Sequence, residues 1–210
     1  MADWYRKKSW SEDDDKDFFL RLGRARKEGR AQYLKIQAIE LIDTKDESLL
    51  KIAESLIHKL FAEYPDDKFN KSSSLKALGD IYSIRNAFDE AIEYYKQAVD
   101  FELIYPQVKT QSYLDYAELV VKSGKIHLFP SIENMILERE KSLWFPIEKY
   151  KVYTILAIIN KQKRNTELAQ YYTDLGEKFA NSETSGLRYH KHLGIVKERD
   201  SWLERLIKGK

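Results

Sequence analysis

Residues 72–106 read SSSLKALGDIYSIRNAFDEAIEYYKQAVDFELIYP, and this stretch decides the fold class that we predict for the chain. Apolar or small residues recur in it at helical spacing, first before the dipeptide Arg85-Asn86 and again after it. The first set is Leu75, Leu78, Gly79 and Tyr82, and the second is Ala91, Tyr95 and Ala98. Glycine costs about 1 kcal/mol relative to alanine inside a helix, so Gly79 indicates that a neighbouring helix approaches closely there. The stretch therefore predicts two helices packed tightly against each other.

A small residue after a larger one returns along the chain at roughly 40-residue intervals, as in helical repeat proteins. The small residues are Ala38, Gly79, Ala117, Ala157 and Gly194. With its Leu78-Gly79 pair and its Ala91, Tyr95 and Ala98 series, the stretch 72–106 resembles a tetratricopeptide (TPR) repeat, a helix–turn–helix unit of about 34 residues. Residues 3–34 resemble the start of uncharacterised bacterial TPR-type proteins. The alternative for residues 72–106 is an ordinary helical hairpin within a globular bundle.

Composition agrees with a helical protein, because the chain is 43% hydrophobic and 33% charged and has only 8 Gly and 4 Pro. The resemblance implies an all-α fold, a right-handed superhelix of antiparallel helix pairs with about ten or eleven helices. Because stacked repeats share a continuous core, we expect a single domain over residues 1–210. Residues 1–30 would be an N-terminal capping segment, residues 31–180 four helix pairs, and residues 184–208 a C-terminal capping helix pair.

The N-terminal segment carries the signals of a separate helix. Ser11 and Asp14 form a capping-box pattern, and acidic residues 12–15 precede basic residues 21–27, which suits the helix dipole. We expect this helix to end at Gly29, and Trp4, Trp10 and Phe18 to cover the first repeat. The alternative is that the basic run at residues 21–30, RLGRARKEGR, binds RNA or an acidic partner.

Four later segments carry local expectations. Thr44 and Glu47 form a second capping-box pattern, which would start a helix. The apolar loop 124–130 should pack against the repeats, and residues 143–145, Leu-Trp-Phe, should lie in the core between them. The last helix pair should occupy about residues 186–197 and 200–207.

No pattern of catalytic or metal-binding residues is present in the sequence. Cysteine is absent, glycines occur singly rather than in phosphate-binding loops, and the four histidines have no zinc-ligand spacing. We therefore expect a protein that is not an enzyme and has neither a cofactor nor a metal. The formal charge of +2 favours neither nucleic acid nor membrane as a partner of the whole chain. With no apolar run at the N-terminus and no transmembrane segment, a cytoplasmic location is expected.

In TPR proteins the first helix of each pair lines a concave groove, and the resemblance implies the same groove here. The implied partner-binding residues are Lys35, Ile39, Lys76, Asp80, Leu114, Glu118, Lys151, Ile158 and Lys161. Most charged members are basic, so we expect a protein or peptide partner with acidic groups, steered by exposed lysines and anchored by the apolar residues. Asp80 stands where TPR proteins that clamp a terminal carboxylate have Asn, which argues against that ligand. The function expected is a non-enzymatic binding scaffold, with a nucleic-acid-associated protein or a bacterial immunity or regulatory protein as alternatives.

Overall fold

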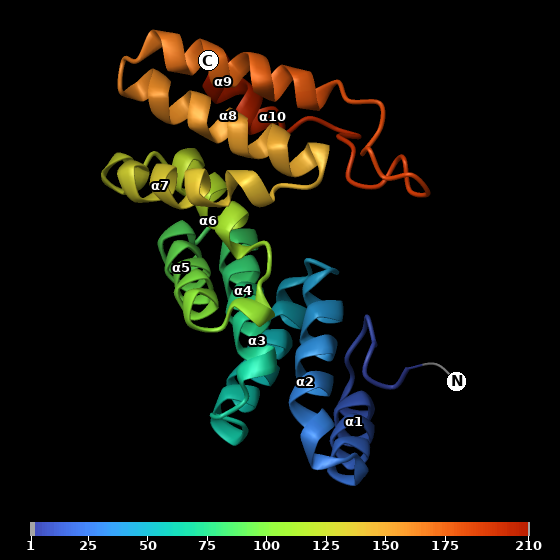
Figure 1. The fold of residues 1–210 in the computed structure, drawn as a ribbon. Coiled ribbons are helices and arrows are strands. Elements are labelled where there is room, and N and C mark those ends of the chain that lie inside the picture. Colours follow the sequence, from blue (N-terminus) through green and yellow to red (C-terminus); the bar gives the residue numbers. More distant parts are fainter. Residues whose placement is uncertain (1–2, 210) are drawn as a thin grey trace. The chain divides into compact units, whose positions relative to one another are not determined.

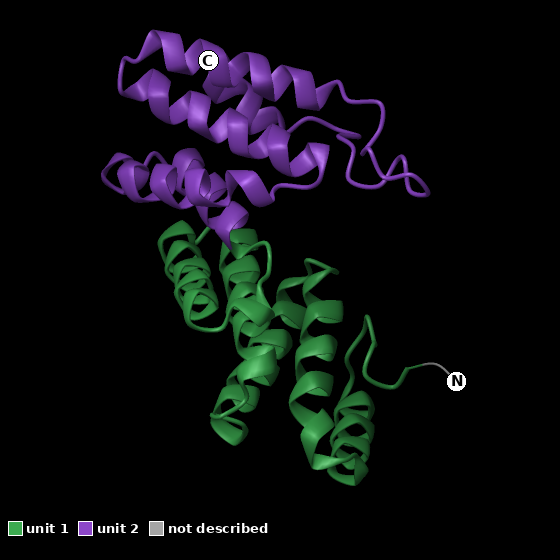
Figure 2. Cartoon of the chain, viewed as in Figure 1, with its two compact units in different colours: residues 1–112 green, residues 113–210 purple. Residues whose placement is uncertain are grey.

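The computed structural model describes residues 3–209, which contain ten α-helices, three short 3-10 helices and no strand. This confirms the predicted all-α class and the expected number of helices (Figure 1). The chain divides into two compact units, residues 1–112 and residues 113–210, which are coloured separately in Figure 2. The single continuous superhelix over residues 1–210 stays a prediction.

Unit 1 holds a terminal helix followed by two helix pairs. Its helices are α1 (Glu12–Arg24), α2 (Lys27–Ile42), α3 (Glu47–Glu63), α4 (Lys68–Ile84) and α5 (Phe88–Ile104), followed by the 3-10 helix η1 (Pro106–Val108). The α2–α3 and α4–α5 connections are short, and the helices of each pair pack against each other. Leucines and isoleucines from α2, α3 and α4 form one buried core with Phe18 of α1.

The close approach predicted at Gly79 is confirmed. A Cβ at this position would lie 2.5 Å from two carbons of the Tyr95 ring on α5. Ala91 and Ala98, which flank Tyr95 on α5, are fully buried. The absence of a side chain at Gly79 therefore gives the buried Tyr95 ring its place between the two helices.

The predicted burial of the N-terminal aromatic residues is also confirmed. Ser11 and Asp14 form the capping box of α1, Phe18 is fully buried, and Trp4 and Trp10 are half-buried against the core of unit 1. The predicted end of this helix at Gly29 was wrong, because α1 ends at Arg24 and Gly29 lies in the first turn of α2. Extended backbone at residues 25 and 26 separates the two helices, and the Arg30 guanidinium satisfies carbonyl groups at their junction.

The predicted capping box at Thr44 and Glu47 was wrong. Asp46 is the N-cap of α3, and its carboxylate accepts hydrogen bonds from the backbone N–H groups of Ser48 and Leu49. Thr44 instead donates its hydroxyl proton to the Leu41 carbonyl oxygen at the end of α2. Lys45 between them has φ 57°, and this left-handed residue turns the chain so that the cap falls two residues later than predicted.

Unit 2 is built around one buried helix. Its helices are α6 (Ser112–Lys122), whose first residue belongs to unit 1, α7 (Phe129–Arg139), α8 (Pro146–Gln162), α9 (Thr166–Ala180) and α10 (Ser201–Lys208), with the 3-10 helices η2 (Ile126–Leu128) and η3 (Glu140–Ser142). Residues 152–160 of α8 are all buried. The α8–α9 pair is close-packed, because a Cβ at Gly176 would approach the Thr154 hydroxyl to 3.2 Å.

Two predictions about apolar segments of unit 2 were right only in part. In the loop 124–130, Phe129 is buried but Ile126 is half exposed. In the segment 143–145, Leu143 is buried and Phe145 half-buried, whereas Trp144 is 73% exposed and is not a core residue. Pro146 starts α8 as expected of a proline in a first helical turn.

The predicted helix at residues 186–197 was wrong, since residues 181–200 contain no helix. Gly194 has φ 70°, and its carbonyl oxygen accepts the Ile147 N–H at 2.8 Å. A Cβ on Gly194 would overlap the Phe145 ring. Gly194 is therefore not the small residue of a fifth helix; it lets an irregular segment pass close to the start of α8. Only the second helix of the predicted C-terminal pair, α10, is present.

Candidate binding surfaces

Two of the four predicted groove residues of unit 1, Lys76 and Asp80, have partners within the chain. Lys76 pairs with Asp80 at 2.9 Å, and Asp80 also accepts the Tyr95 hydroxyl at 2.7 Å. Lys35 is half-buried, and this burial lowers the pKa of its ammonium group. Ile39 is partly exposed. The expectation that Lys76 is freely solvated was wrong, because its side chain is only 26% exposed and ion-paired.

In unit 2 the predicted groove residues are covered or paired. Glu118 pairs with Lys151 at 2.7 Å and also with Lys122. Leu114 and Ile158 are only 6% and 8% exposed, so in this conformation they are core residues and not contacts for a partner. Lys161 donates to the Ile207 carbonyl oxygen of α10 at 2.7 Å.

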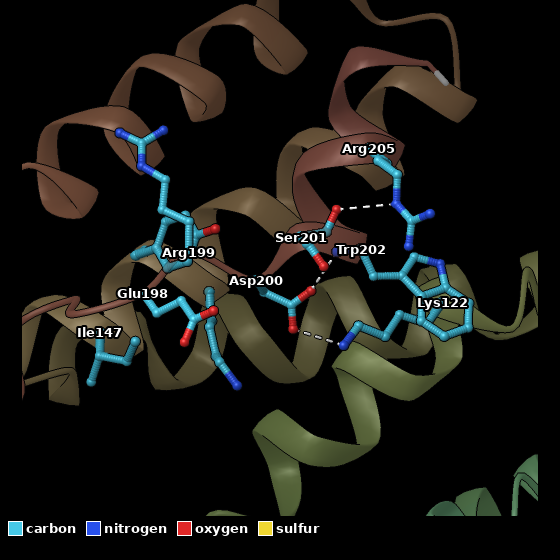
Figure 3. Close-up of a pocket in the computed structure, with 10 residues that line it drawn as sticks. Lys122, Ile147, Glu198, Arg199, Asp200, Ser201, Trp202 and Arg205 are labelled. Atoms are coloured by element: carbon cyan, nitrogen blue, oxygen red, sulfur yellow. Dashed lines mark hydrogen bonds and ion pairs between the residues drawn. The ribbon is translucent and has the colours of Figure 1, made fainter.

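A polar pocket of about 450 Å³ lies beside the first turn of α10 (Figure 3). Asp200, the N-cap of α10, accepts the N–H groups of Trp202 and Leu203 at 2.9 Å and pairs with Lys122 at 2.8 Å. Burial opposes ionisation of Asp200, but these donors outweigh it and hold the pKa of its carboxyl below the usual value. The pocket is lined by Lys122, Ile147, Tyr150, Lys151, Glu198, Arg199, Asp200, Ser201, Trp202 and Arg205.

Most polar groups around this pocket already stabilise unit 2. Arg199 forms two hydrogen bonds with the Glu177 carboxylate, at 2.7 and 2.8 Å. The Tyr150 hydroxyl donates to Glu204 at 3.0 Å; burial and this bond raise the pKa of Tyr150. These contacts attach α10 and the segment before it to α8 and α9, so the pocket is space left open where α10 packs against α8.

Unit 1 carries a more apolar pocket of about 350 Å³, which we name the α3–α5 pocket. It lies between α3, the α3–α4 turn, α4 and α5, and is lined by His58, Phe61, Tyr64, Pro65, Asp67, Lys71, Leu75, Leu78, Tyr94 and Gln97. Its aromatic rings, from Phe61, Tyr64 and Tyr94, are half-buried. At 3.6 residues per turn, its α4 residues Leu75 and Leu78 lie on a different face of α4 from Asp80, so this pocket is not part of the predicted groove.

One end of the α3–α5 pocket is held by a hydrogen-bonded network. Tyr94 stacks on Tyr82 with 5.3 Å between ring centroids, and the Tyr82 hydroxyl donates to Glu54 at 2.7 Å. Arg85 pairs with the same carboxylate at 2.8 Å. The Glu54 hydrogen bond raises the pKa of Tyr82 to about 12. Tyr94, which lines the pocket, is thus held by stacking on a Tyr82 ring that is itself fixed by Glu54.

The lining of the α3–α5 pocket includes one lysine, Lys71, and one carboxylate, Asp67, which accepts hydrogen bonds from Asn70. The Lys71 ammonium lies 5.4 Å from the centre of the Phe101 ring, and Lys68 lies 5.1 Å from that of Tyr105. Neither lysine forms an ion pair with a carboxylate of residues 3–209. Phe101 and Tyr105 are half-buried, and a lysine over such a ring can exchange a weak cation–π contact for a carboxylate of a partner.

This pocket was not predicted from the sequence, although the sequence carries a signal for it. Tyr94, Gln97, Phe101 and Tyr105 recur every three or four residues along α5 and its C-cap, beside the packing series of Ala91, Tyr95 and Ala98. A second aromatic stripe on a helix that already has a packing stripe indicates either a further neighbour or an exposed aromatic face.

The basic run at the α1–α2 junction is partly used within unit 1. Arg21 pairs with Asp17 at 2.8 Å, and Arg30 donates to the carbonyl oxygens of Gly23 and Ala25. The Arg21 pair lies within α1 and the Arg30 bonds join α2 to the end of α1, so both arginines have partners inside unit 1 and the basic surface is smaller than the sequence suggested.

Comparison with protein-family models found no matching family, and comparisons with curated proteins and with solved structures found no significant match. Among residues 3–209, no group of three or more His, Asp or Glu side chains is placed to hold a metal ion. None of the helices in the same residues has the length and apolar character needed to cross a membrane.

Proposed function

We propose that this protein is a non-enzymatic, TPR-like helical-repeat protein with a right-handed superhelical arrangement of its helix pairs, and that it binds a peptide or protein segment. The observation that supports this is the α3–α5 pocket, an open, aromatic-lined hollow on two packed helix pairs. Its volume lies at the lower end of the range of about 300–1,000 Å³ for ligand pockets. A pocket of that size accommodates one or two side chains of a partner.

The lining defines the chemistry of the segment that binds. Phe61, Tyr64 and Tyr94 surround an apolar floor made by Leu75 and Leu78, which suits an aromatic or large aliphatic side chain. Such anchors in aromatic pockets carry most of the affinity at many interfaces. Next to this anchor, the unpaired ammonium of Lys71 favours a carboxylate. The proposed ligand is therefore a segment with a large apolar residue close to an Asp or Glu.

The position of the pocket changes the predicted mode of binding. TPR-like grooves use the first helices, whereas this pocket is formed by both second helices, α3 and α5, over α4. In unit 1 the first-helix charges Lys76 and Asp80 already pair with each other. An adaptor, a regulator or an immunity protein could all act by such binding, because each needs a specific contact and no chemistry.

A peptide display library selected on the full chain tests the proposal. Enriched peptides should share an aromatic or large aliphatic residue near an acidic residue. Their affinity should fall at least tenfold with Tyr94→Ala, because a buried anchor contact is lost, and two- to tenfold with Lys71→Glu. Tyr171→Ala and Lys109→Glu are matched controls at exposed positions outside the pocket, and they should leave affinity unchanged.

Selected peptides that bind Tyr94→Ala and Lys71→Glu as well as the parent would refute the α3–α5 pocket as the site. Circular dichroism of each variant must first show unchanged helix content, so that lost binding is not lost folding.

A further inference from the structure

We propose that the loop between α9 and α10 binds single-stranded nucleic acid, with a nucleobase stacked on Tyr189 and phosphate groups paired with the basic residues around it. The segment that carries this proposal is residues 184–197, TSGLRYHKHLGIVK, which we name the basic loop. It lies in unit 2, so this site is independent of the α3–α5 pocket of unit 1.

The basic loop carries positive charge and no carboxylate. It contains Arg188, Lys191 and Lys197 and has neither Asp nor Glu. All three cations are exposed, and none of them pairs with a carboxylate among residues 3–209. By contrast, Lys122 and Lys151 on the helices of unit 2 pair with carboxylates of the same unit. The charge of the basic loop is therefore not used to hold unit 2 together and can meet an anionic ligand.

An exposed aromatic ring lies among these charges. Tyr189 is 81% exposed, and the Arg188 guanidinium lies 5.2 Å from the centre of its ring. Residues 188–193 are all exposed, so no side chain of this run is held in the core. The tyrosine contributes little buried surface to the fold, and its ring is open to a planar ligand.

The basic loop is ordered by its own backbone contacts. The Ser185 N–H donates to the Lys191 carbonyl oxygen at 2.6 Å, and the Ser185 hydroxyl donates to the His190 carbonyl oxygen at 2.8 Å. These two bonds close residues 185–191 into a compact turn, which holds Arg188 and Tyr189 between its ends. A ligand that binds there meets side chains whose backbone is already fixed, so less ordering is needed on binding.

The setting of the basic loop is that of a functional loop. It lies within residues 181–200, a connection without helix that exceeds the usual limit of about 12–15 residues, and loops of that length in compact domains are often binding loops. In Figure 1 this connection extends beyond the ends of α8 and α9 before it returns to α10.

A second exposed ring lies near the end of the basic loop. Trp144 is 73% exposed. The next residue, Phe145, packs against Gly194 of the basic loop, and the Gly194 carbonyl oxygen accepts the Ile147 N–H at 2.8 Å. The end of the basic loop is therefore fixed to the start of α8, beside a tryptophan on which a further base can stack.

These features favour a single strand over other anionic ligands. Proteins that bind single strands without sequence preference combine basic groups for the phosphates with aromatic side chains on which the bases stack. In a duplex the base faces are already stacked, so Tyr189 would gain no such contact. The carboxylates of an acidic protein would pair with Arg188 and Lys191 but would not stack on the ring.

Fluorescence anisotropy of the full chain with labelled oligouridylate and oligodeoxythymidylate of about 12 nucleotides tests the proposal. Each phosphate contact of a single strand adds about −0.7 to the slope of log affinity against log salt. Three contacts give a slope of about −2, so affinity should fall about twentyfold between about 50 and 200 mM salt. Binding of either strand supports the proposal, and the tighter one identifies the sugar. A duplex of the same length should bind at least fivefold more weakly.

Two variants of the basic loop separate charge from stacking. Arg188→Ala combined with Lys191→Ala should reduce the slope to about −0.7, because one phosphate contact remains. Tyr189→Ala should lower affinity at least fivefold at every salt concentration and leave the slope unchanged, because stacking is not ionic. All three side chains are exposed, so circular dichroism should show unchanged helix content.

Matched controls remove the same groups elsewhere. Arg26→Ala combined with Lys27→Ala removes two exposed cations at the α1–α2 junction, and Tyr171→Ala removes a tyrosine of α9 that is 56% exposed. Both controls should bind like the parent. If the Arg26 and Lys27 pair lowers the slope and the basic-loop pair does not, the site is the α1–α2 junction and the proposal is wrong.

Three other results would overturn the proposal. The first is no binding of either strand at about 50 mM salt, and the second is binding that Tyr189→Ala leaves unchanged. The third is a polyglutamate peptide of equal charge that binds as tightly as the oligonucleotides, since the partner would then be an acidic protein.

Discussion

Gly79→Ala is the sharpest test of the packing between α4 and α5. Alanine is favoured over glycine by about 1 kcal/mol inside a helix, so the substitution stabilises any helix that has room for a methyl group. At Gly79 the new Cβ would lie 2.5 Å from the Tyr95 ring, whereas a relaxed carbon–carbon contact is about 3.5–4.0 Å. The ring must therefore move by about 1 Å, and it is buried with its hydroxyl held 2.7 Å from Asp80.

Overpacking of a core costs about 1–3 kcal/mol, to which the strained Tyr95–Asp80 hydrogen bond adds. Against the helical gain of about 1 kcal/mol, we expect Gly79→Ala to lower the free energy of unfolding by about 1–2 kcal/mol. Gly23→Ala is the matched control, because Gly23 lies in α1 with no atom within 4 Å of a new Cβ. It should raise stability by up to about 1 kcal/mol.

Urea unfolding followed by circular dichroism, with hydrogen exchange at the α4 amides, measures both variants. If Gly79→Ala is as stabilising as Gly23→Ala, the close approach is not what requires glycine. A double variant tests whether the Tyr95 ring causes the loss of stability. In a chain that already carries Tyr95→Leu, Gly79→Ala should lower the free energy of unfolding by less, or should raise it. A penalty that persists unchanged in that background would mean that Tyr95 is not its source.

Three further predictions concern the N-terminal segment, the carboxylate of Asp14 and the glycine at position 194. Deleting residues 1–28 should cause aggregation or a lower melting temperature, measured by light scattering and calorimetry, because the apolar face that they cover becomes exposed. The free energy of unfolding should fall as pH drops from about 4 toward 2. Lys7 and Ser11 lower the pKa of Asp14 to about 2 in the folded chain, so protonation of Asp14 in this range removes stabilising contacts. Asp14→Asn should therefore make the stability, followed by circular dichroism, depend less on pH. Gly194→Ala should increase hydrogen exchange at the start of α8, because φ 70° is unfavourable for alanine and its Cβ would overlap Phe145; unchanged exchange would contradict this.

Local chemistry made some elements of the fold predictable. The Ser11–Asp14 capping box and the glycine beside Tyr95 each act within one or two turns, and the sequence contains everything that determines them. The cap of α3 was misplaced because Thr44 and Asp46 are both good N-cap residues, and only the left-handed backbone at Lys45 selects between them. The second aromatic stripe of α5 indicated an exposed face or a further neighbour, but the α3–α5 pocket itself also depends on how α3, α4 and α5 lie together, which the pattern of one helix does not encode.

The C-terminal segment shows how a repeat pattern can mislead. Leu193-Gly194 has the same residue types as Leu78-Gly79. At position 194, however, glycine is needed for the positive φ and for the close contact with Phe145, and not for the approach of two helices. A glycine indicates that the backbone approaches another group closely, whether that backbone is helical or irregular. It indicates a repeat only where flanking residues also show helical periodicity, and the charged and polar residues around 186–192 do not.

The cover over α8 could have been anticipated from the sequence. Residues 152–160 read VYTILAIIN, without a charge over nine positions, and a helix that is apolar all round is buried. A groove-facing role for Thr154 and Ile158 requires one solvated face, which this segment lacks. Some other part of the chain had to cover that face, and α9 does so at Thr154, because a Cβ on Gly176 would lie 3.2 Å from the Thr154 hydroxyl oxygen. Because Thr154 and Ile158 are only 1% and 8% exposed, a partner can contact them only after a helix that covers α8 has moved away, and its affinity must exceed the cost of that movement.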